Sequence, residues 1–275
     1  MVDYYAVKHF GVIESLMQEI DNLQNSINEK RPLYPERWSA VTEKLKMEWT
    51  YDSNAIEGST LTLGETIFFL REGLTVEGKP LKDFLDARNH VDAIDFMYDV
   101  VSDQRPVSEG LIKEVNALLL KGVEYTDAVD PSGKKTKKKA TPGQYKKAPN
   151  TVIQLDGTIY EYTDPLHVTA EMEALISWIN VKVDSEHGLL TGTVAHHNIA
   201  RIHPFDDGNG RVARMLMNLI FMKKGLPPAV IRNELRRQYL DALSRADKGD
   251  MEPFVLFVGD ALVKTQIMII EELSK

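Results

Sequence analysis

Apolar residues recur every three or four positions along most of the 275-residue chain, which predicts a protein built mainly from α-helices. One such pattern runs from about residue 4 to 29, and a second, separated from it by Pro32 and Pro35, leads to residue 57. Thr62 and Glu65 have the spacing of a capping box, so a helix is expected to begin there and end near Gly73. Further helices are expected at 83–101, 107–121, 168–183, 188–202, 209–224, 232–247 and 252–273.

Residues 151–162 have the pattern of a β-hairpin instead. Asp156-Gly157 separates two short runs rich in β-branched and aromatic residues, which is a strong signal for a two-residue turn. In that register Val152 would lie opposite Glu161. A lone hairpin exposes a strand edge, and one use of such an edge is pairing with an extended segment of another protein. The predicted fold class is therefore all-α with one short β-hairpin.

A third segment, residues 127–147, is rich in lysine, with seven lysines between residues 134 and 147. Like charges without apolar anchors predict a mobile surface loop. A lysine run of this kind can attract phosphates or acidic partners, although a solvated loop accounts for the composition without any partner.

Composition narrows the function classes. No apolar run approaches the roughly 20 residues needed to cross a bilayer, and the first residues lack the apolar core and cleavage site of a secretory signal. The absence of cysteine excludes disulfides and thiolate chemistry. The net charge of −8 argues against broad nucleic-acid binding. We therefore expect a cytoplasmic protein that acts neither in a membrane nor on nucleic acid.

The residues that carry chemistry gather between positions 203 and 214. Gly208, Asn209 and Gly210 stand where a helix is expected to start, and a glycine-rich entry to a helix N-terminus is an anion site suited to phosphate. Arg211 and Arg214 lie three positions apart and off the apolar stripe, and guanidinium groups suit bidentate phosphate contacts. The Gly-Lys-Ser/Thr of a Walker loop is missing.

His203 and two carboxylates directly precede this glycine-rich turn. His203 could act as a general base near neutral pH. Asp206 or Asp207 could hold a magnesium ion that also binds phosphates. Each feature alone is common, but base, metal ligand, anion site and two arginines occur here within twelve residues.

The stretch SNAIEG, residues 53–58, poses an electrostatic question. Gly58 is expected to end the preceding helix in a left-handed cap. Glu57 then stands in the last turn, where the helix dipole disfavours a carboxylate. Ser53, four residues earlier, faces the same side of the helix. Either Glu57 is solvated, or it has a cationic partner elsewhere in the chain.

The stretch HPFDDGNGR, together with Arg214, resembles the signature of the Fic (Fido) family, His-Pro-Phe-x-Asp/Glu-Gly-Asn-Gly-Arg-x-x-Arg. The upstream hairpin resembles the family's target-binding flap, which assigns target docking to Val152, Ile153 and Gln154. Ser53-x-x-x-Glu57-Gly58 resembles the family's inhibitory motif, Ser/Thr-x-x-x-Glu-Gly/Asn. The resemblance implies an N-terminal helical region over 1–104 with the inhibitory motif, a catalytic domain over 105–262, and a C-terminal helix end over 263–275.

This resemblance implies adenylylation, the transfer of AMP from ATP to a Tyr, Ser or Thr hydroxyl of a target protein or of the enzyme itself. His203 would take the hydroxyl proton, and Mg²⁺ on Asp207 would neutralise charge on the α- and β-phosphates. The amides of residues 208–210 and Asn209 would cradle the phosphates, with Arg211 beside them and Arg214 at the γ-phosphate. A Glu57–Arg214 ion pair would inhibit the reaction by occupying that arginine. Asp206 fills the variable position of the motif and is expected in solvent or in a structural contact.

Other functions remain open at this stage. The same site could remove AMP or use another phosphate-linked donor. His196 and His197, with His203 and the two aspartates, could suggest a metal-dependent phosphohydrolase, but that leaves Gly-Asn-Gly-Arg unexplained; we expect these two histidines on the helix surface and in core packing. A third alternative is a binding module without catalysis. The sequence does not decide the oligomeric state.

Overall fold

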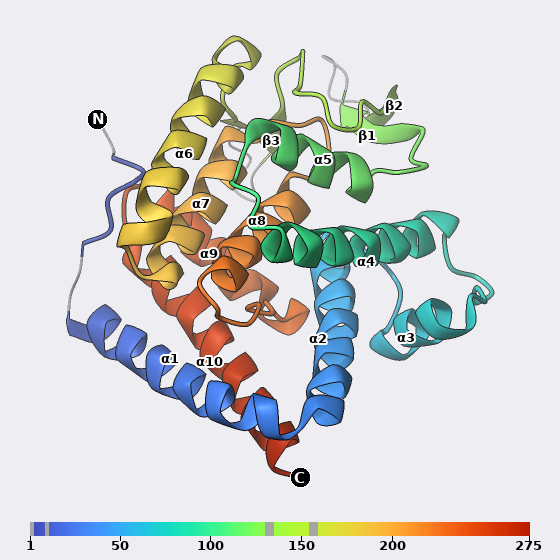
Figure 1. The fold of residues 1–275 in the computed structure, drawn as a ribbon. Coiled ribbons are helices and arrows are strands. Elements are labelled where there is room, and N and C mark those ends of the chain that lie inside the picture. The colour runs from blue at the N-terminus through green and yellow to red at the C-terminus, as the bar shows by residue number, and fades with distance from the viewer. Residues whose placement is uncertain (1–2, 9–10, 130–134, 154–158) are drawn as a thin grey trace.

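The computed structural model describes residues 3–8, 11–129, 135–153 and 159–275, and helices make up most of it (Figure 1). The helices are α1 (Gly11–Lys30), α2 (Pro35–Ile56), α3 (Leu63–Glu72), α4 (Leu81–Ser102), α5 (Glu109–Leu119), α6 (Pro165–Ser185), α7 (Gly188–Ile202), α8 (Asn209–Lys223), α9 (Arg236–Ala246) and α10 (Glu252–Ser274). Two short 3₁₀ helices, η1 (Arg31–Leu33) and η2 (Asn233–Leu235), and four strands, β1 (Tyr125–Val129), β2 (Lys135–Lys139), β3 (Thr151–Ile153) and β4 (Ile159–Glu161), complete it. The predicted mainly helical fold class is confirmed.

Several helix ends follow directly from the sequence signals. The Thr62 hydroxyl accepts a hydrogen bond from the Glu65 amide, and the Glu65 carboxylate accepts one from the Thr62 amide, so the predicted capping box starts α3. Gly73 ends this helix at φ +70°, and Gly58 follows α2 at φ +99°. Both are left-handed conformations that favour glycine, as expected for helix caps.

The start of the first helix differs from the prediction. α1 begins at Gly11, not near residue 4. Tyr5 instead packs its ring on Trp178 of α6, with ring centroids 5.4 Å apart, and the Tyr4 carbonyl accepts a hydrogen bond from Asn198 of α7. These contacts hold the N-terminal segment across other helices, which overrides its local helical pattern.

The two hairpins also correct the sequence reading. β3 and β4 pair antiparallel as expected, but Val152 lies opposite Tyr160 and not Glu161, so five residues connect the strands and the two-residue turn was wrong. The connection, 154–158, lies outside the described residues, and Gln154 lies there too. The lysine run was predicted to be an irregular loop, yet part of it forms β2, which pairs with β1 along five residues.

α7 and α8 form the centre of the molecule. All twelve residues from Gly188 to Ile199 are buried, and the buried face of α8 includes Val212, Met215 and Leu219. A Cβ atom on Gly192 would come within 2.4 Å of the Phe221 ring, so this glycine lets the two helices approach closely. The loop between α7 and α8 is consequently attached at both ends to buried, closely packed helices.

One described helix is long and apolar enough to cross a membrane by length and composition alone, which corrects the expectation that no such run exists. It is α10, whose most apolar 18-residue window has a mean hydropathy of 1.6. Of that window 56 % is buried inside the protein, and Gly259 lies so close to α1 that a Cβ there would meet the Leu16 side chain at 2.4 Å. α10 thus packs as a core helix of this fold.

Candidate active site

A six-residue loop from His203 to Gly208 connects α7 to α8 and carries the centre of the motif. His203 ends α7 at φ +52°, and its amide donates to the Ile199 carbonyl at 2.9 Å. Gly208 precedes α8 at φ +78°. A residue with a side chain in this left-handed conformation costs about 1–3 kcal/mol and persists only where its surroundings impose it. His203 is therefore held in place by the fold around it.

Side-chain amides hold this loop from within and from outside. The Asn209 carboxamide accepts from the Phe205 amide and donates to the Phe205 carbonyl, both at 2.8 Å. Asn150 donates to the same carbonyl at 2.9 Å, and the buried Asn116 donates to the Asp207 carbonyl at 3.0 Å. The Asn209 side chain was expected to bind phosphate, and in this structure its hydrogen bonds stabilise the loop. Asn150 and Asn116, which the sequence did not single out, stabilise the same loop.

The first turn of α8 presents backbone N–H groups, as the sequence predicted for an anion site. The carboxylate of Glu57, the residue that follows α2, occupies the space beside it. A Cβ built on Gly210 would lie 2.3 Å from the Glu57 Oε1 atom, so only glycine allows Glu57 to approach the helix this closely. The Glu57 carboxylate, at the C-terminal end of α2, therefore lies beside the N-terminus of α8, whose helix dipole favours a negative charge.

Arg214 is the cationic partner of Glu57. Its Nη2 atom lies 2.7 Å from Glu57 Oε1 and 2.9 Å from the Ser53 carbonyl, and its Nε donates to the Ser53 hydroxyl at 2.9 Å. Nη1 reaches the Tyr239 hydroxyl at 3.5 Å. Ser53 in the last turns of α2 and Glu57 at its C-cap, four residues apart, therefore both contact the same arginine.

The Glu57 carboxylate and the Arg214 guanidinium each favour the charged form of the other. Arg214 is 2 % exposed, whereas the Glu57 side chain is 41 % exposed. Burial alone would raise the pKa of Glu57, but the neighbouring Arg214 guanidinium outweighs this effect and keeps the pKa of Glu57 below its ordinary value. Both groups are charged at neutral pH.

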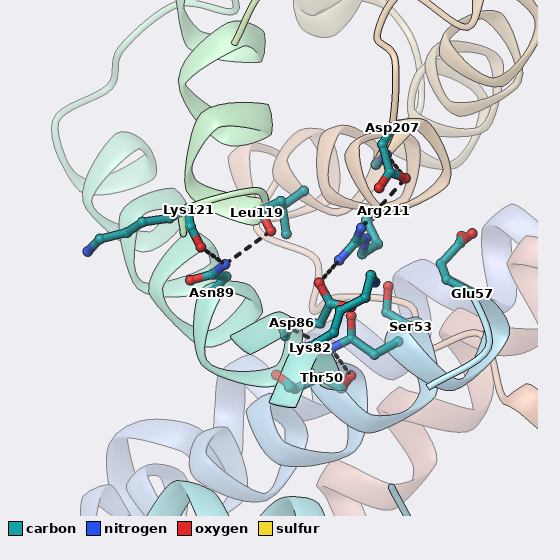
Figure 2. A network of polar contacts seen from close by, with 12 residues as sticks. Thr50, Ser53, Glu57, Lys82, Asp86, Asn89, Leu119, Lys121, Asp207 and Arg211 are labelled. Atoms are coloured by element: carbon teal, nitrogen blue, oxygen red, sulfur yellow. Dashed lines mark hydrogen bonds and ion pairs between the residues drawn. The ribbon is translucent and has the colours of Figure 1, made fainter. Parts of the chain in front are cut away.

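The other arginine of the motif, Arg211, is bound to α4. Arg211 Nη1 donates to Asp86 at 2.7 Å, and Arg211 Nη2 lies 3.9 Å from Asp207 (Figure 2). Arg211 is 2 % exposed and Asp86 is 4 % exposed. The sequence reading missed Asp86, because it precedes Arg211 by 125 residues and stands in an ordinary helical stretch.

The His203 ring has a defined setting. It stacks on the Tyr162 ring, with centroids 3.7 Å apart and an angle of 18° between the planes. Its Nδ1 lies 3.4 Å from the Ala200 carbonyl, so an Nδ1–H would leave Nε2 as the proton acceptor. Burial, followed by the positive charge of Lys146, lowers the pKa of His203 to about 4. The imidazole is thus neutral at pH 7.

The two aspartates of the loop differ. Both Asp206 oxygens are engaged, one by Lys138 at 2.5 Å and the other by the Thr141 hydroxyl at 2.8 Å. Asp207 is a third exposed, and its Oδ1 accepts from the Gly208 amide at 2.6 Å. Asp206 therefore serves a structural contact, one of the two outcomes expected for it.

The other two histidines of α7 are not at the helix surface. His196 and His197 are both fully buried, so that part of the expectation was wrong. His196 contacts the Tyr239 hydroxyl at 2.8 Å, and His197 contacts Asp247 at 2.9 Å. Within the described part of the chain, no three His, Asp or Glu side chains are grouped to hold a metal ion by themselves.

Comparison with known proteins now identifies the family. The family model described as Fic/DOC matches residues 106–221. A crystal structure of a Fic domain containing signaling protein from Bacteroides thetaiotaomicron superimposes with a TM-score of 0.82, at 30 % identity over 93 % of this chain and 97 % of that one. The chain belongs to the Fic/DOC family.

Curated relatives of this Fic chain are named for an activity. The protein adenylyltransferase Fic of Drosophila grimshawi is 30 % identical over 78 % of this chain and 41 % of its own length. The protein adenylyltransferase fic-1 of Caenorhabditis elegans is 26 % identical over 90 % of this chain and 44 % of its own length. The chain spans about two fifths of the length of these relatives. The division into regions at 104 and 262 stays a prediction.

Proposed function

We propose that this Fic chain is a protein adenylyltransferase, which transfers AMP from ATP to a Tyr, Ser or Thr hydroxyl of a target protein and also modifies itself. One observation carries the proposal. The His203–Gly208 loop brings a neutral, rigidly held imidazole next to the N-terminus of α8, so a base and a phosphate site adjoin. The names of the curated relatives support the same activity.

In this proposal, the hydroxyl oxygen of the target attacks the α-phosphorus of ATP while His203 Nε2 takes the hydroxyl proton. The bond between the α-phosphorus and the bridging oxygen breaks, and pyrophosphate leaves. The N–H groups of residues 208–210 bind the phosphates, because a helix N-terminus favours anions. Arg214 would reach the γ-phosphate once it is released from Glu57, and Arg211 beside it adds positive charge while bound to Asp86.

Asp207 fits a magnesium ion in this scheme. The ion is commonly held in proteins by one or two carboxylates together with substrate phosphates, so a single, partly exposed carboxylate next to the phosphate site is the expected donor set. When bound, Mg²⁺ supplies neutralising charge for the phosphates.

Two further parts of the proposal concern regulation and docking. The Glu57–Arg214 pair acts as an intramolecular brake, because the carboxylate occupies the guanidinium that the γ-phosphate needs and repels that phosphate. The β3–β4 hairpin, including Val152 and Ile153, acts as the docking edge for an extended segment of the target.

The decisive experiment replaces His203 by Ala in a Glu57→Gly background, where the brake is absent. AMP transfer from labelled ATP should fall 10²–10⁴-fold, because positioned acid–base catalysis contributes about that factor. ATP binding should be retained, since the phosphate contacts lie elsewhere. His167→Ala, at an exposed histidine of α6, is the matched control. Transfer that survives within about tenfold would remove His203 from the role of base.

A further inference from the structure

The lysine-rich hairpin β1–β2 is anchored to the motif loop by its inner face. Lys138 of β2 lies opposite Thr126 of β1, which is 3 % exposed. The Lys138 amino group contacts Asp206, and the Thr141 hydroxyl just after the strand contacts the other oxygen of the same carboxylate. Asp206 stands between Phe205 and Asp207 of the motif. The hairpin is therefore attached to the loop that carries His203.

The outer face of this hairpin follows from strand geometry. Successive side chains of a strand point to opposite faces, so Lys137 and Lys139 lie on the face opposite to Lys138. Both are exposed. Tyr125, which is 58 % exposed, lies opposite Lys139 in the register. We call Tyr125, Lys137 and Lys139 the lysine face. In the register of the two strands, Asp127 lies opposite Lys137.

The lysine face is positioned to meet a target protein. β1–β2 and β3 lie at the same end of the molecule (Figure 1), and only eleven residues, 140–150, connect β2 to β3. Within this connection, Tyr145 forms a β-bridge with Phe205 of the motif and the Lys146 amide donates to the Pro204 carbonyl at 2.8 Å. The segment between the two hairpins is thus attached to the loop that carries His203, and a target held at the β3–β4 edge would lie at the same end of the molecule as the lysine face.

We propose that the lysine face binds an acidic segment of the target protein, next to the hydroxyl that is modified. Two lysines and an exposed tyrosine suit carboxylates on a peptide, which they attract by charge while the ring supplies contact area. The net charge of −8 argues against broad binding of nucleic acid, which needs an extended basic surface, so the attraction for anions is local to the lysine face. Binding of an acidic peptide by the lysine face does not depend on AMP transfer, but the role of this binding in selecting targets rests on the proposed function.

A binding assay without nucleotide tests the surface by itself. The probes are two fluorescent 12-residue peptides with one central Tyr, which differ only in six Glu replaced by Gln. The protein should bind the Glu peptide about fivefold or more tightly than the Gln peptide at 20 mM salt, and the preference should vanish at about 500 mM salt because charges are screened. Equal binding of both peptides at low salt would overturn the proposal.

Variants assign the preference to the hairpin. Lys137→Glu combined with Lys139→Glu should abolish the preference for the Glu peptide, whereas Lys137→Arg with Lys139→Arg should keep it. Lys248→Glu with Lys264→Glu makes the same change of charge at exposed lysines outside the hairpin and should keep most of the preference. An equal loss in both charge-reversed proteins would mean that only net charge matters, and the lysine face would be rejected.

Two more arms separate the alternatives. A 12-nucleotide thymidine DNA strand should bind more weakly than the Glu peptide; tighter binding of the DNA would make the partner a nucleic acid and overturn the proposal. In the Glu57→Gly background with ATP, the Glu peptide should also be the better AMP acceptor. If the binding preference holds while neither peptide nor the protein itself accepts AMP, the lysine face stands and the proposed adenylyltransferase function fails.

Discussion

Arg214 is buried, and three different side chains contact its guanidinium group. Ser53 holds it through a hydroxyl and a carbonyl, Tyr239 lies at its far side, and Glu57 supplies the only carboxylate that contacts it within the described part of the chain. The position of the guanidinium is therefore set mainly by neutral groups, and Glu57 adds the charge. A γ-phosphate could replace that carboxylate without moving the arginine.

Substitution of Glu57 should therefore release activity without dismantling the site. Glu57→Gly should raise self-adenylylation strongly, because misplacement of a phosphate by about 1 Å can cost 10²-fold and this cause of misplacement is removed. Glu57→Asp, with a shorter reach to Arg214, should raise it less. Labelled AMP incorporation under matched Mg²⁺ and ATP measures both. No gain in Glu57→Gly would return Glu57 to the role of an ordinary helix-end carboxylate.

The control for that experiment is Arg214 itself. Combining Glu57→Gly with Arg214→Ala should abolish the gain, since the released arginine is what orders the triphosphate. A double variant that remained as active as Glu57→Gly would show that relief does not pass through Arg214.

The setting of His203 predicts an unusual pH profile. Because burial and Lys146 lower its pKa to about 4, the imidazole is already neutral, and ready to accept a proton, well below pH 6.5. Single-turnover AMP transfer by the Glu57→Gly protein, at saturating Mg²⁺ and ATP, should change little between about pH 7 and pH 5.5 and fall as pH approaches 4. A midpoint near 6.5, that of an ordinary histidine, would contradict this setting.

At the scale of elements, the β3–β4 hairpin yields a test of docking through the main chain. Successive N–H groups of a strand point to opposite sides. One of the two variants Val152→Pro and Ile153→Pro therefore removes a donor from the outer edge of the hairpin, and the other removes a donor from the ladder with β4. In the variant that loses the outer donor, AMP transfer to targets and to the protein itself should fall, while the affinity for ATP should be unchanged. Val152→Ala keeps every N–H group and should retain most activity. Unchanged target modification in both proline variants would refute the docking role.

Some elements could be predicted from the sequence because their signals are local. α7 has the bounds expected from its apolar periodicity, and α3 has the capping box. The errors arose where distant contacts decide the conformation. The lysine run forms β2 where Lys138 meets Asp206, 68 residues away, and the segment before Gly11 is held by α6 and α7.

The candidate site divides in the same way. The residues from His203 to Arg214 are contiguous in the sequence and form a recognisable motif, so their chemical roles could be predicted from the sequence. The Glu57–Arg214 pair was predictable only because Glu57 violated the preference of a helix end and matched a known inhibitory motif. Asp86, Asn116 and Tyr239 follow no local rule, because each acts through a side chain brought in by packing.

At the scale of the whole molecule, the site depends on helices that are far apart in the chain. α2 and the residue that follows it supply Ser53 and Glu57, α4 supplies Asp86, and α8 supplies Arg211 (Figure 2). Arg214, also on α8, contacts both Ser53 and Glu57. Under the proposed function, nucleotide binding and the contact between Glu57 and α8 would be linked, since both would use Arg214. By linkage, a ligand that binds only the folded protein stabilises it by RT ln(1 + L/Kd), where L is the free ligand concentration, so the stabilisation grows with the logarithm of the affinity.

This competition can be measured as thermal stability without any turnover. In a His203→Ala background, addition of ATP and Mg²⁺ should raise Tm more when Glu57→Gly is also present, because the γ-phosphate then has Arg214 to itself. A tenfold gain in affinity corresponds to about 1.4 kcal/mol of added stabilisation, or a further rise of about 3–5 °C in a domain of this size. ADP lacks the γ-phosphate and should stabilise both proteins equally, which controls for any general effect of the glycine. If ATP raised Tm equally in both proteins, Glu57 would not compete with the nucleotide, and inhibition through Arg214 would have to be abandoned.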